Sequence, residues 1–298
     1  MPKPDPPFGD AEREACRKLL NLALVEDLGE AGDVTSSATI AENATGRVRI
    51  VSRQQGVAAG LPIAALVCDA VSGGRITVDA GEDGAAVSPG DVVATLEGPV
   101  RQLLTAERTV LNFLTHLSGV ATLAAEFAEK VAGTNAVVLD TRKTLPGWRV
   151  LAKYAARCGG AANHRMGLFD MVLIKDNHIA AWRASHPDAS LSQILDGVRE
   201  STPAGTPVMI EVDTLDQLRQ AVAGDPPDFV LLDNMSNDQL CEAVAVRDDA
   251  APSVRLEASG GVNLQTVAGI AKTGVDRISV GAITHSAPNF DFGFDWAD

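Results

Sequence analysis

Six short apolar runs in the second half of the chain end on residues that can do chemistry. In chain order, the groups that close these runs are Asp140 to Lys143, Lys175 to His178, Glu211, Asp233, Ser259 to Gly261 and Val280 to Ala282. The first two groups are rich in cations, the next two are carboxylates, and the last two are turns of small residues around glycine. A repeated pattern of this kind predicts a shared site.

Each class of residue suits a different part of an anionic ligand. Arginine offers a planar fork to a carboxylate or phosphate, and lysine offers a point charge. Two carboxylates on neighbouring strands can hold Mg²⁺, which prefers oxygen ligands. Glycine turns expose backbone N–H groups to a phosphate. Together the groups predict a site for a phosphorylated, metal-associated anion beside a second anion.

Positive charge is concentrated in one window of an acidic chain. The formal net charge is −14, yet residues 140–175 carry seven Lys or Arg against two Asp. Within the window, the four-residue spacing of Arg149, Lys153 and Arg157 predicts a solvated helix face. We expect the other cations to offset the charge of anionic substrates at close range.

The apolar runs alternate with helical segments such as LDQLRQAVAG and LQTVAGIAKTG. Short continuous apolar strands between helices indicate parallel strands buried on both faces. We expect an incomplete α/β barrel of about six parallel strands, whose site lies at the carboxyl ends of the strands. An open doubly wound sheet is the rival, but the chain contains neither GxGxxG after a strand nor GxxxxGK[ST].

The first half of the chain has a different pattern. Short alternating runs between Gly46 and Gly98 predict strands separated by glycine turns, and residues 105–132 predict one long apolar helix. We predict an N-terminal α/β sandwich domain over residues 1–115, joined by the tail 286–298, and a barrel domain over residues 116–285.

Composition excludes several classes of function. The acidic balance argues against binding to nucleic acid or to anionic membranes. No run reaches the roughly 18 apolar residues of a membrane span, and the N-terminus lacks an apolar signal region. The four cysteines are scattered without a CxxC pair, which favours reduced thiols in the cytoplasm over disulfides or a zinc site.

Several longer motifs resemble the quinolinate phosphoribosyltransferase family, also called carboxylating nicotinate-nucleotide pyrophosphorylases. The similarity covers about Glu26 to Phe292, and the matching stretches are EDLG-x-x-GDVT, AERTVLNFL-x-x-LSG-x-AT, DTRKT-x-PG-x-R, NHR-x-GL-x-D, LIKDNH, LLDN and ASGG…GVD-x-I-x-VGA-x-THS. The resemblance implies a sandwich and an incomplete barrel. It also implies transfer of phosphoribosyl from phosphoribosyl pyrophosphate to quinolinate, with release of pyrophosphate and CO₂, in NAD synthesis.

The resemblance also implies roles for individual residues. The quinolinate carboxylates would be held by Arg142, Arg165 and His164, with Lys175. Thr141 would also bind substrate, and Arg108 would be donated across a homodimer. On the other substrate, Lys143 would meet the pyrophosphate, Glu211 and Asp233 the ribose hydroxyls and Mg²⁺, and the 5′-phosphate would lie at Ser259, Gly260, Gly261, Val280, Gly281 and Ala282. Lys143, Lys175, Glu211 and Asp233 would be catalytic.

Three other functions remain open from the sequence. A related phosphoribosyltransferase could use nicotinate, which has one carboxylate and needs fewer cations. A Schiff-base lyase could use Lys175 as its nucleophile. Residues 46–98 could form a carrier-like binding module, but no lysine lies at a hairpin tip there.

Overall fold

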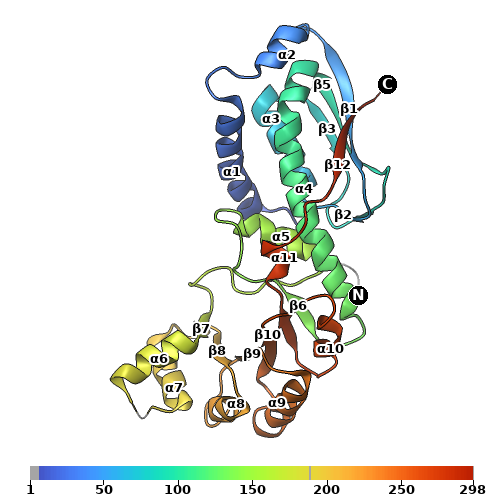
Figure 1. Cartoon of the computed structure of the whole chain (residues 1–298). Coiled ribbons are helices and arrows are strands. Elements are labelled where there is room, and N and C mark those ends of the chain that lie inside the picture. Colours follow the sequence, from blue (N-terminus) through green and yellow to red (C-terminus); the bar gives the residue numbers. More distant parts are fainter. Residues whose placement is uncertain (1–6, 188, 298) are drawn as a thin grey trace. The chain divides into compact units, whose positions relative to one another are not determined.

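The computed structural model describes residues 7–187 and 189–297, and the chain forms two compact units (Figure 1). The first unit comprises Met1–Glu126, Lys143–Ala161 and Ile283–Asp298, and the second comprises Phe127–Arg142 and Ala162–Ala282. These units describe spatial compactness, and the sequence-based domain boundary between residues 115 and 116 stays a prediction.

The first unit combines helices with a mainly antiparallel sheet. Its elements are α1 (Asp10–Leu28), α2 (Val34–Thr39), β1 (Thr45–Ser52), β2 (Gly56–Val57), α3 (Leu61–Ser72), β3 (Thr77–Ala80), β4 (Ala86–Val87), β5 (Val92–Pro99), most of α4 (Val100–Lys130), α5 (Arg149–Cys158), most of α11 (Ala282–His285) and β12 (Phe292–Trp296). The four-stranded sheet has the order β12-β1-β5-β3, and β2 pairs with β4.

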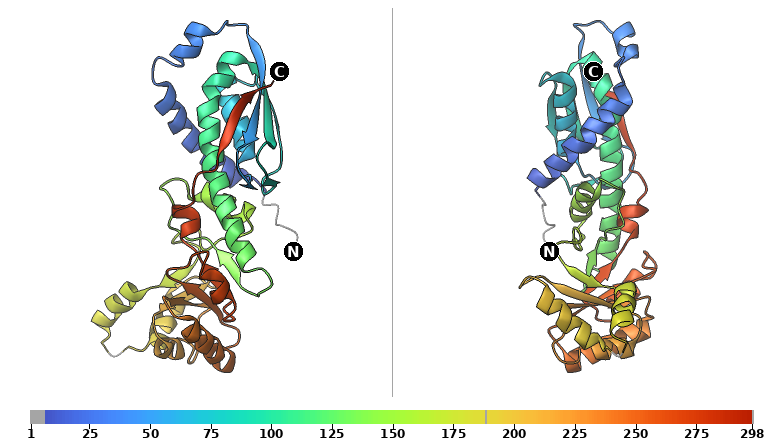
Figure 2. Two further views of the ribbon diagram at one scale, coloured as in Figure 1. Left: turned by 45° about the vertical axis from the view of Figure 1, so that its right-hand side comes forward. Right: turned by 90° about the vertical axis from the view of Figure 1, so that its left-hand side faces the viewer.

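The last strand of the chain belongs to the first sheet. β12 pairs antiparallel with β1 from Val48 opposite Trp296 to Ser52 opposite Phe292, and the views in Figures 1 and 2 show the two strands side by side. Both sheet partners of β1 are antiparallel, and its residues Val48 and Ile50 are fully buried.

One helix, α4, is much longer than the others and continues unbroken in all views (Figure 2). It begins at Val100, five residues before the predicted start at 105, and ends at Lys130. By length and composition alone it could cross a membrane, but 61% of its most apolar 18-residue window is buried within the protein. Leu103, Leu114 and Leu117 have no exposed surface, as expected of a core helix.

The second unit contains a six-stranded parallel sheet, which confirms the predicted strands. Its elements are β6 (Val137–Leu139), β7 (Val172–Ile174), α6 (Asp176–Ser185), α7 (Leu191–Ser201), β8 (Val208–Val212), α8 (Leu215–Ala221), β9 (Phe229–Asp233), α9 (Asn237–Ala250), β10 (Arg255–Ser259), α10 (Val267–Ala271) and β11 (Arg277–Ser279). The strand order is β6-β11-β10-β9-β8-β7, so β6 and β7 are the open edges. An α/β fold with an incomplete parallel barrel is therefore confirmed.

Local sequence explains where three helices of this unit begin. Ser190, Thr214 and Ser236 each cap the helix that follows, and each accepts a backbone N–H three residues later. A glutamine at that third position returns a bond to the cap residue's own N–H. These reciprocal bonds satisfy N–H groups that lack partners at a helix start.

The predicted solvated face of Arg149, Lys153 and Arg157 is wrong. Lys153 has no exposed surface, and Arg157 Nη2 lies 2.9 Å from Glu12 Oε1 on α1. The helix α5 packs against α1 within the first unit, so one side of it is core. The four-residue spacing of the charges correctly predicted a helix. It could not predict that α1, which is distant in the sequence, packs against that helix.

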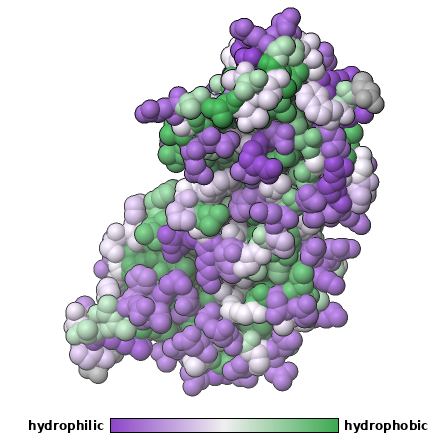
Figure 3. Space-filling model, turned by 45° about the horizontal axis from the view of Figure 1, so that its top comes forward, coloured by the Kyte–Doolittle hydropathy of each residue, from purple (hydrophilic) through white to green (hydrophobic). Residues whose placement is uncertain are grey.

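The acidic chain presents many polar residues to solvent. Figure 3 shows hydrophilic residues across much of the visible face, with smaller hydrophobic areas between them. Large exposed apolar residues include Leu168 and Phe169, which are 74% and 82% exposed.

Candidate active site

The strand register places several polar side chains on one face of the parallel sheet. Glu211 on β8 and Glu257 on β10 are both register partners of Leu231 on β9, and Glu257 is also the partner of Arg277 on β11. Two residues further along, Asp233 pairs with Ser259. Because register partners in a sheet point to the same side, these residues share one face.

The strand order also brings the predicted groups together within the second unit. The carboxylates end neighbouring strands β8 and β9, and Lys175 follows β7 beside them. The turns of small residues follow the neighbouring strands β10 and β11, and Thr141 and Arg142 follow β6 at the next position. Arg108 and Lys143 belong instead to the first unit.

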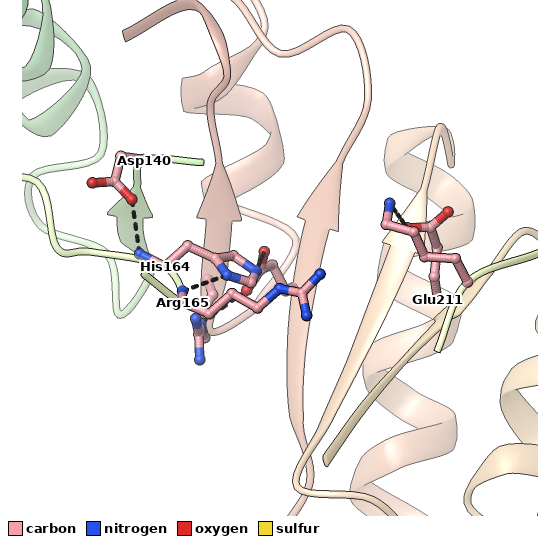
Figure 4. A network of polar contacts seen from close by, with 7 residues as sticks. Asp140, His164, Arg165 and Glu211 are labelled. Carbon is pink, nitrogen blue, oxygen red and sulfur yellow. Dashed lines mark hydrogen bonds and ion pairs between the residues drawn. The ribbon is translucent and has the colours of Figure 1, made fainter. Parts of the chain in front are cut away.

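Two of the predicted residues form an ion pair. Lys175 Nζ lies 2.8 Å from Glu211 Oε2, and Figure 4 shows Glu211 with this contact as a dashed line. The Lys175 side chain is 44% exposed, whereas that of Glu211 is only 15% exposed. The Lys175 nitrogen already donates to this carboxylate and is not free to act as a nucleophile, so the geometry opposes the Schiff-base alternative.

The turn after β10 is built on glycines with left-handed backbone. Gly260 and Gly261 have φ values of +91° and +61°. Neighbouring Asn234, at φ 53°, donates its backbone N–H to Ser259 O at 2.9 Å and its side-chain amide to Asp233 Oδ2 at 2.6 Å. The end of β9 and the glycine turn therefore support each other.

We expect Gly260→Ala to distort this turn more than an ordinary glycine substitution does. A Cβ at Gly260 would lie 2.1 Å from Asn234 Oδ1 and 2.9 Å from its backbone nitrogen. Gly224 is the matched control, because its φ is +88° and a Cβ added there would have nothing within 4 Å. Gly224→Ala should cost only the left-handed backbone penalty of about 1–2 kcal/mol in unfolding free energy.

Thermal unfolding and phosphoribosyl pyrophosphate titration of both variants test this expectation. Gly260→Ala should lower the melting temperature further and weaken ligand binding, and equal behaviour of the two variants would contradict it.

Arg142 and Arg165 form a cationic pair. Burial lowers the pKa of the Arg165 guanidinium below its ordinary value, and the positive charge of Arg142 lowers it further. Arg142 Nε is buried without a hydrogen-bond partner among the described residues. Arg165 Nη1 donates to the carbonyl oxygen of Met171 at 3.1 Å. Two neighbouring arginines with a buried, unsatisfied donor fit a multiply charged anion.

The loop after Arg165 is closed by Asp170, which sequence reasoning left without a role. Its carboxylate accepts the backbone N–H groups of Met166 at 2.6 Å and Gly167 at 3.0 Å. Burial opposes ionisation, but these bonds and the charge of Arg165 hold the pKa of Asp170 below its usual range. The last residue of the motif NHR-x-GL-x-D thus fixes the backbone of the loop that the motif forms.

His164 is held from several sides, and one of its neighbours, Glu257, was not placed in the site by sequence reasoning. Its backbone N–H donates to Asp140 Oδ1 at 2.9 Å, and its Nδ1 accepts the backbone N–H of Arg165 at 2.7 Å (Figure 4). Its Nε2 lies 3.2 Å from Glu257 Oε1. Asp140 and Glu257 have no exposed surface. The only sequence signal for Glu257 was a charged residue within an apolar strand.

Glu211 and Asp233 fit the predicted role in holding Mg²⁺. Both are oxygen donors on one face of neighbouring strands, and both are partly exposed. Among residues 7–187 and 189–297, no group of three or more His, Cys, Asp or Glu side chains is placed to hold a metal ion. Two carboxylates suit a Mg²⁺ ion that keeps water or substrate oxygens as its other ligands.

Several cavities lie in the second unit. A cavity of about 440 Å³ is lined by residues along β6 and at the starts of β10 and β11, including Val137, Arg255 and Arg277. An apolar cavity of about 580 Å³ is lined by Arg165 and by residues of β7, α6 and α7, and one of about 170 Å³ is lined in part by Glu211. Two of the predicted site residues therefore border cavities of the second unit.

Comparison with known proteins agrees with this geometry. Residues 33–118 match the family model described as quinolinate phosphoribosyl transferase, N-terminal domain, and residues 120–295 match the C-terminal domain. The chain is 44% identical to a nicotinate-nucleotide pyrophosphorylase [carboxylating] of Mycobacterium leprae, over 97% of this chain and 99% of that protein. It is 40% identical to a probable enzyme of the same name from Synechocystis, over 90% and 88% of the two chains.

Solved structures show the same relationship. The nicotinate-nucleotide pyrophosphorylase of Francisella tularensis superposes with a TM-score of 0.86 at 35% identity, covering 95% of this chain and 96% of that one. The enzyme of Ehrlichia chaffeensis also has a TM-score of 0.86, at 34% identity over 94% and 98% of the chains. With both family domains matched and near-complete coverage of these relatives, the chain belongs to the quinolinate phosphoribosyl transferase family.

Proposed function

We propose that this protein transfers phosphoribosyl from phosphoribosyl pyrophosphate to quinolinate and releases pyrophosphate and CO₂, forming nicotinate mononucleotide for NAD synthesis. Membership of the family and the names of its relatives support this reaction. The observation that carries it in this chain is the pair of Arg142 and Arg165, with a buried guanidinium nitrogen that lacks a partner among the described residues. A pyridine dicarboxylate supplies the two negative groups that such a pair needs.

An assay of both products tests the proposal. Quinolinate, phosphoribosyl pyrophosphate and Mg²⁺ should yield pyrophosphate and CO₂ in equal amounts. Nicotinate has one carboxylate fewer, so it should react poorly if at all. Pyrophosphate release with nicotinate at a rate similar to that with quinolinate would favour the related nicotinate-using activity instead.

The two substrates divide the proposed site between them. We assign the quinolinate carboxylates to Arg142, His164, Arg165 and Lys175, with Thr141 beside them. The 5′-phosphate falls to the turns that contain Gly260, Gly261 and Gly281 and to their neighbours Ser259, Val280 and Ala282, whose backbone can approach it closely. Lys143 is assigned to the pyrophosphate. Its carbonyl oxygen accepts Thr284 Oγ1–H at 2.8 Å, which anchors its backbone.

The chemistry is a displacement followed by a decarboxylation. The pyridine nitrogen forms a bond to C1 of the ribose while the bond from C1 to the pyrophosphate oxygen breaks. The charge that develops on pyrophosphate is stabilised by Lys143, and Mg²⁺ when bound adds electrostatic stabilisation of the same charge. No proton transfer is needed in this step. The rest of the acceleration therefore comes from holding the pyridine nitrogen in line with C1 of the ribose.

Decarboxylation uses the charge created by the first step. The quaternised ring nitrogen stabilises the electron pair left at C2 when the bond to the carboxylate breaks, and a proton from water completes the product. A tight ion pair to that carboxylate would oppose its loss. Lys175 is suited to this place, because its exposed ammonium already has an alternative partner in Glu211 and can release the carboxylate.

We expect Glu211→Ala and Asp233→Ala to raise the Mg²⁺ concentration needed for activity. Each variant removes an oxygen ligand from the phosphoribosyl side of the site, so half-maximal activity should shift by about tenfold or more in Mg²⁺. Asp216→Ala is the control, because this carboxylate is 86% exposed and paired with surface Arg219. Activity of the wild type in excess chelator would reject the metal role.

The protein is further proposed to act as a cytoplasmic homodimer. Arg108 lies exposed on α4 in the first unit, and a two-fold interface would let each subunit lend this residue to the other's site. The free thiols of all four cysteines support a reducing compartment.

A further inference from the structure

Glu257 is a buried charged residue for which the reaction provides no direct use. It lies within β10, has no exposed surface, and faces two nitrogen groups from different parts of the chain. Its Oε1 lies 3.2 Å from His164 Nε2, and its Oε2 lies 3.0 Å from Arg277 Nε. Neither contact has the alignment of a hydrogen bond, so charge and proximity provide the attraction.

The contacts of His164 restrict where its proton can lie. Nδ1 accepts the backbone N–H of Arg165 at 2.7 Å, so Nδ1 must be unprotonated for this bond to form. The proton of the neutral ring then lies on Nε2, which faces the Glu257 carboxylate. Through Nδ1 the His164 ring holds the backbone of Arg165 in place.

We propose that Glu257 is a positioning residue for quinolinate binding, acting through the tautomer of His164 on the backbone and guanidinium of Arg165. The proposal rests on the proposed role of Arg165 in holding a quinolinate carboxylate. Glu257 selects the tautomer with the proton on Nε2, and Nδ1 then fixes the Arg165 amide. From that fixed point the Arg165 side chain extends to Met171 O and lies near Arg142.

Only a carboxylate satisfies both neighbours of Glu257. Arg277 carries donors and no acceptor, and His164 presents its Nε2–H, so both groups need an acceptor. Glutamine has the same shape but one acceptor and one donor end. Arg277 cannot lose its charge, so it should take the glutamine oxygen and leave the amide NH₂ facing His164 Nε2.

We therefore expect Glu257→Gln to move the imidazole proton from Nε2 to Nδ1. The Nδ1–H would then oppose the Arg165 N–H, and the Arg165 backbone would have to shift. Quinolinate affinity should fall by roughly tenfold, as for loss of one charge-assisted contact, while affinity for phosphoribosyl pyrophosphate should stay unchanged. Glu242→Gln is the matched control, because Glu242 is paired with Arg219 on the surface of the same unit.

A second substitution should reverse the effect. Arg277→Met in the Glu257→Gln background removes the competing donor, so the glutamine oxygen can turn to His164 Nε2–H. The double variant should regain the Nε2–H tautomer and most of the quinolinate affinity. Loss of packing alone would not produce this recovery, because the double variant departs further from the native side chains.

Nitrogen-15 NMR of the histidine ring and calorimetric titration of each ligand test the proposal together. Wild-type protein should show a protonated Nε2 and an unprotonated Nδ1 at His164, a measurement that does not depend on how well any variant folds. The opposite tautomer in the wild type would overturn the proposal. So would unchanged quinolinate affinity in folded Glu257→Gln, or failure of a folded double variant to recover. If Arg165→Ala itself leaves quinolinate affinity unchanged, the proposed function of that arginine fails instead.

Discussion

Replacing Arg142 or Arg165 by alanine should weaken quinolinate binding by roughly 10- to 150-fold and leave phosphoribosyl pyrophosphate binding nearly unchanged. Each substitution removes one charge-assisted contact to a carboxylate, which is worth about 1.5–3 kcal/mol. Burial, and then the positive charge of Arg142, lower the pKa of the Arg165 guanidinium, so a bound carboxylate would offset unfavourable charge at this place.

Calorimetric titration with each ligand separately measures this selectivity. Arg219→Ala is the control, because Arg219 is about half exposed and paired with the surface carboxylates of Asp216 and Glu242. It should bind both ligands as the wild type does. Equal loss of affinity for the two ligands in Arg142→Ala or Arg165→Ala would show that the arginines do not distinguish the carboxylate side of the site.

The two arginines should also be coupled in the double variant. They share one anion in the proposed arrangement, so the effects of the single substitutions should not add. Additive losses would mean that the two arginines act independently of each other. Lysine in place of either arginine should recover only part of the affinity, because an ammonium cannot form the paired bonds of a planar guanidinium.

Mixing two inactive variants should restore about a quarter of wild-type activity, if Arg108 completes the site of a partner subunit. Arg108→Ala keeps Lys175 and the other barrel residues, whereas Lys175→Ala keeps Arg108. Each homodimer should be nearly inactive, because every one of its sites lacks a cation. In a mixed dimer one site carries both defects and the other carries none.

The recovered fraction follows from random pairing. Equal amounts of the two chains give mixed dimers about half of the time, and each mixed dimer has one intact site of two. Mass spectrometry must show that subunits exchange under the conditions used. Exchange without recovery would mean that Arg108 serves its own chain or has no part in the site.

A further control separates the dimer from the site. Arg108→Ala should keep the oligomeric mass of the wild type in solution, because one exposed side chain is removed. Full activity of this variant would reject any role for Arg108. Loss of activity together with dissociation would assign the residue to the interface and not to the substrate.

Much of this protein could be inferred from the sequence because its signals are local. Each parallel strand of the second unit is a short apolar run that closes on Asp140, Lys175, Glu211, Asp233, Ser259 or Gly281, and the structure contains all six strands. Parallel strands that are buried on both faces have to be apolar, so their positions can be predicted from apolar runs in the sequence. Parallel strands also place their carboxyl ends at one edge, so the polar groups that follow them could be predicted to share a site.

Tertiary structure decided what happens to charges that must be buried. Lys153 and Glu257 look in the sequence like ordinary charged residues, yet neither has exposed surface. Glu257 meets His164 from a segment far earlier in the chain and Arg277 from the next strand, and no local pattern encodes which distant group will neutralise a charge. Burying an unpaired charge is so costly that such partners must exist, but only the packing of the folded chain selects them.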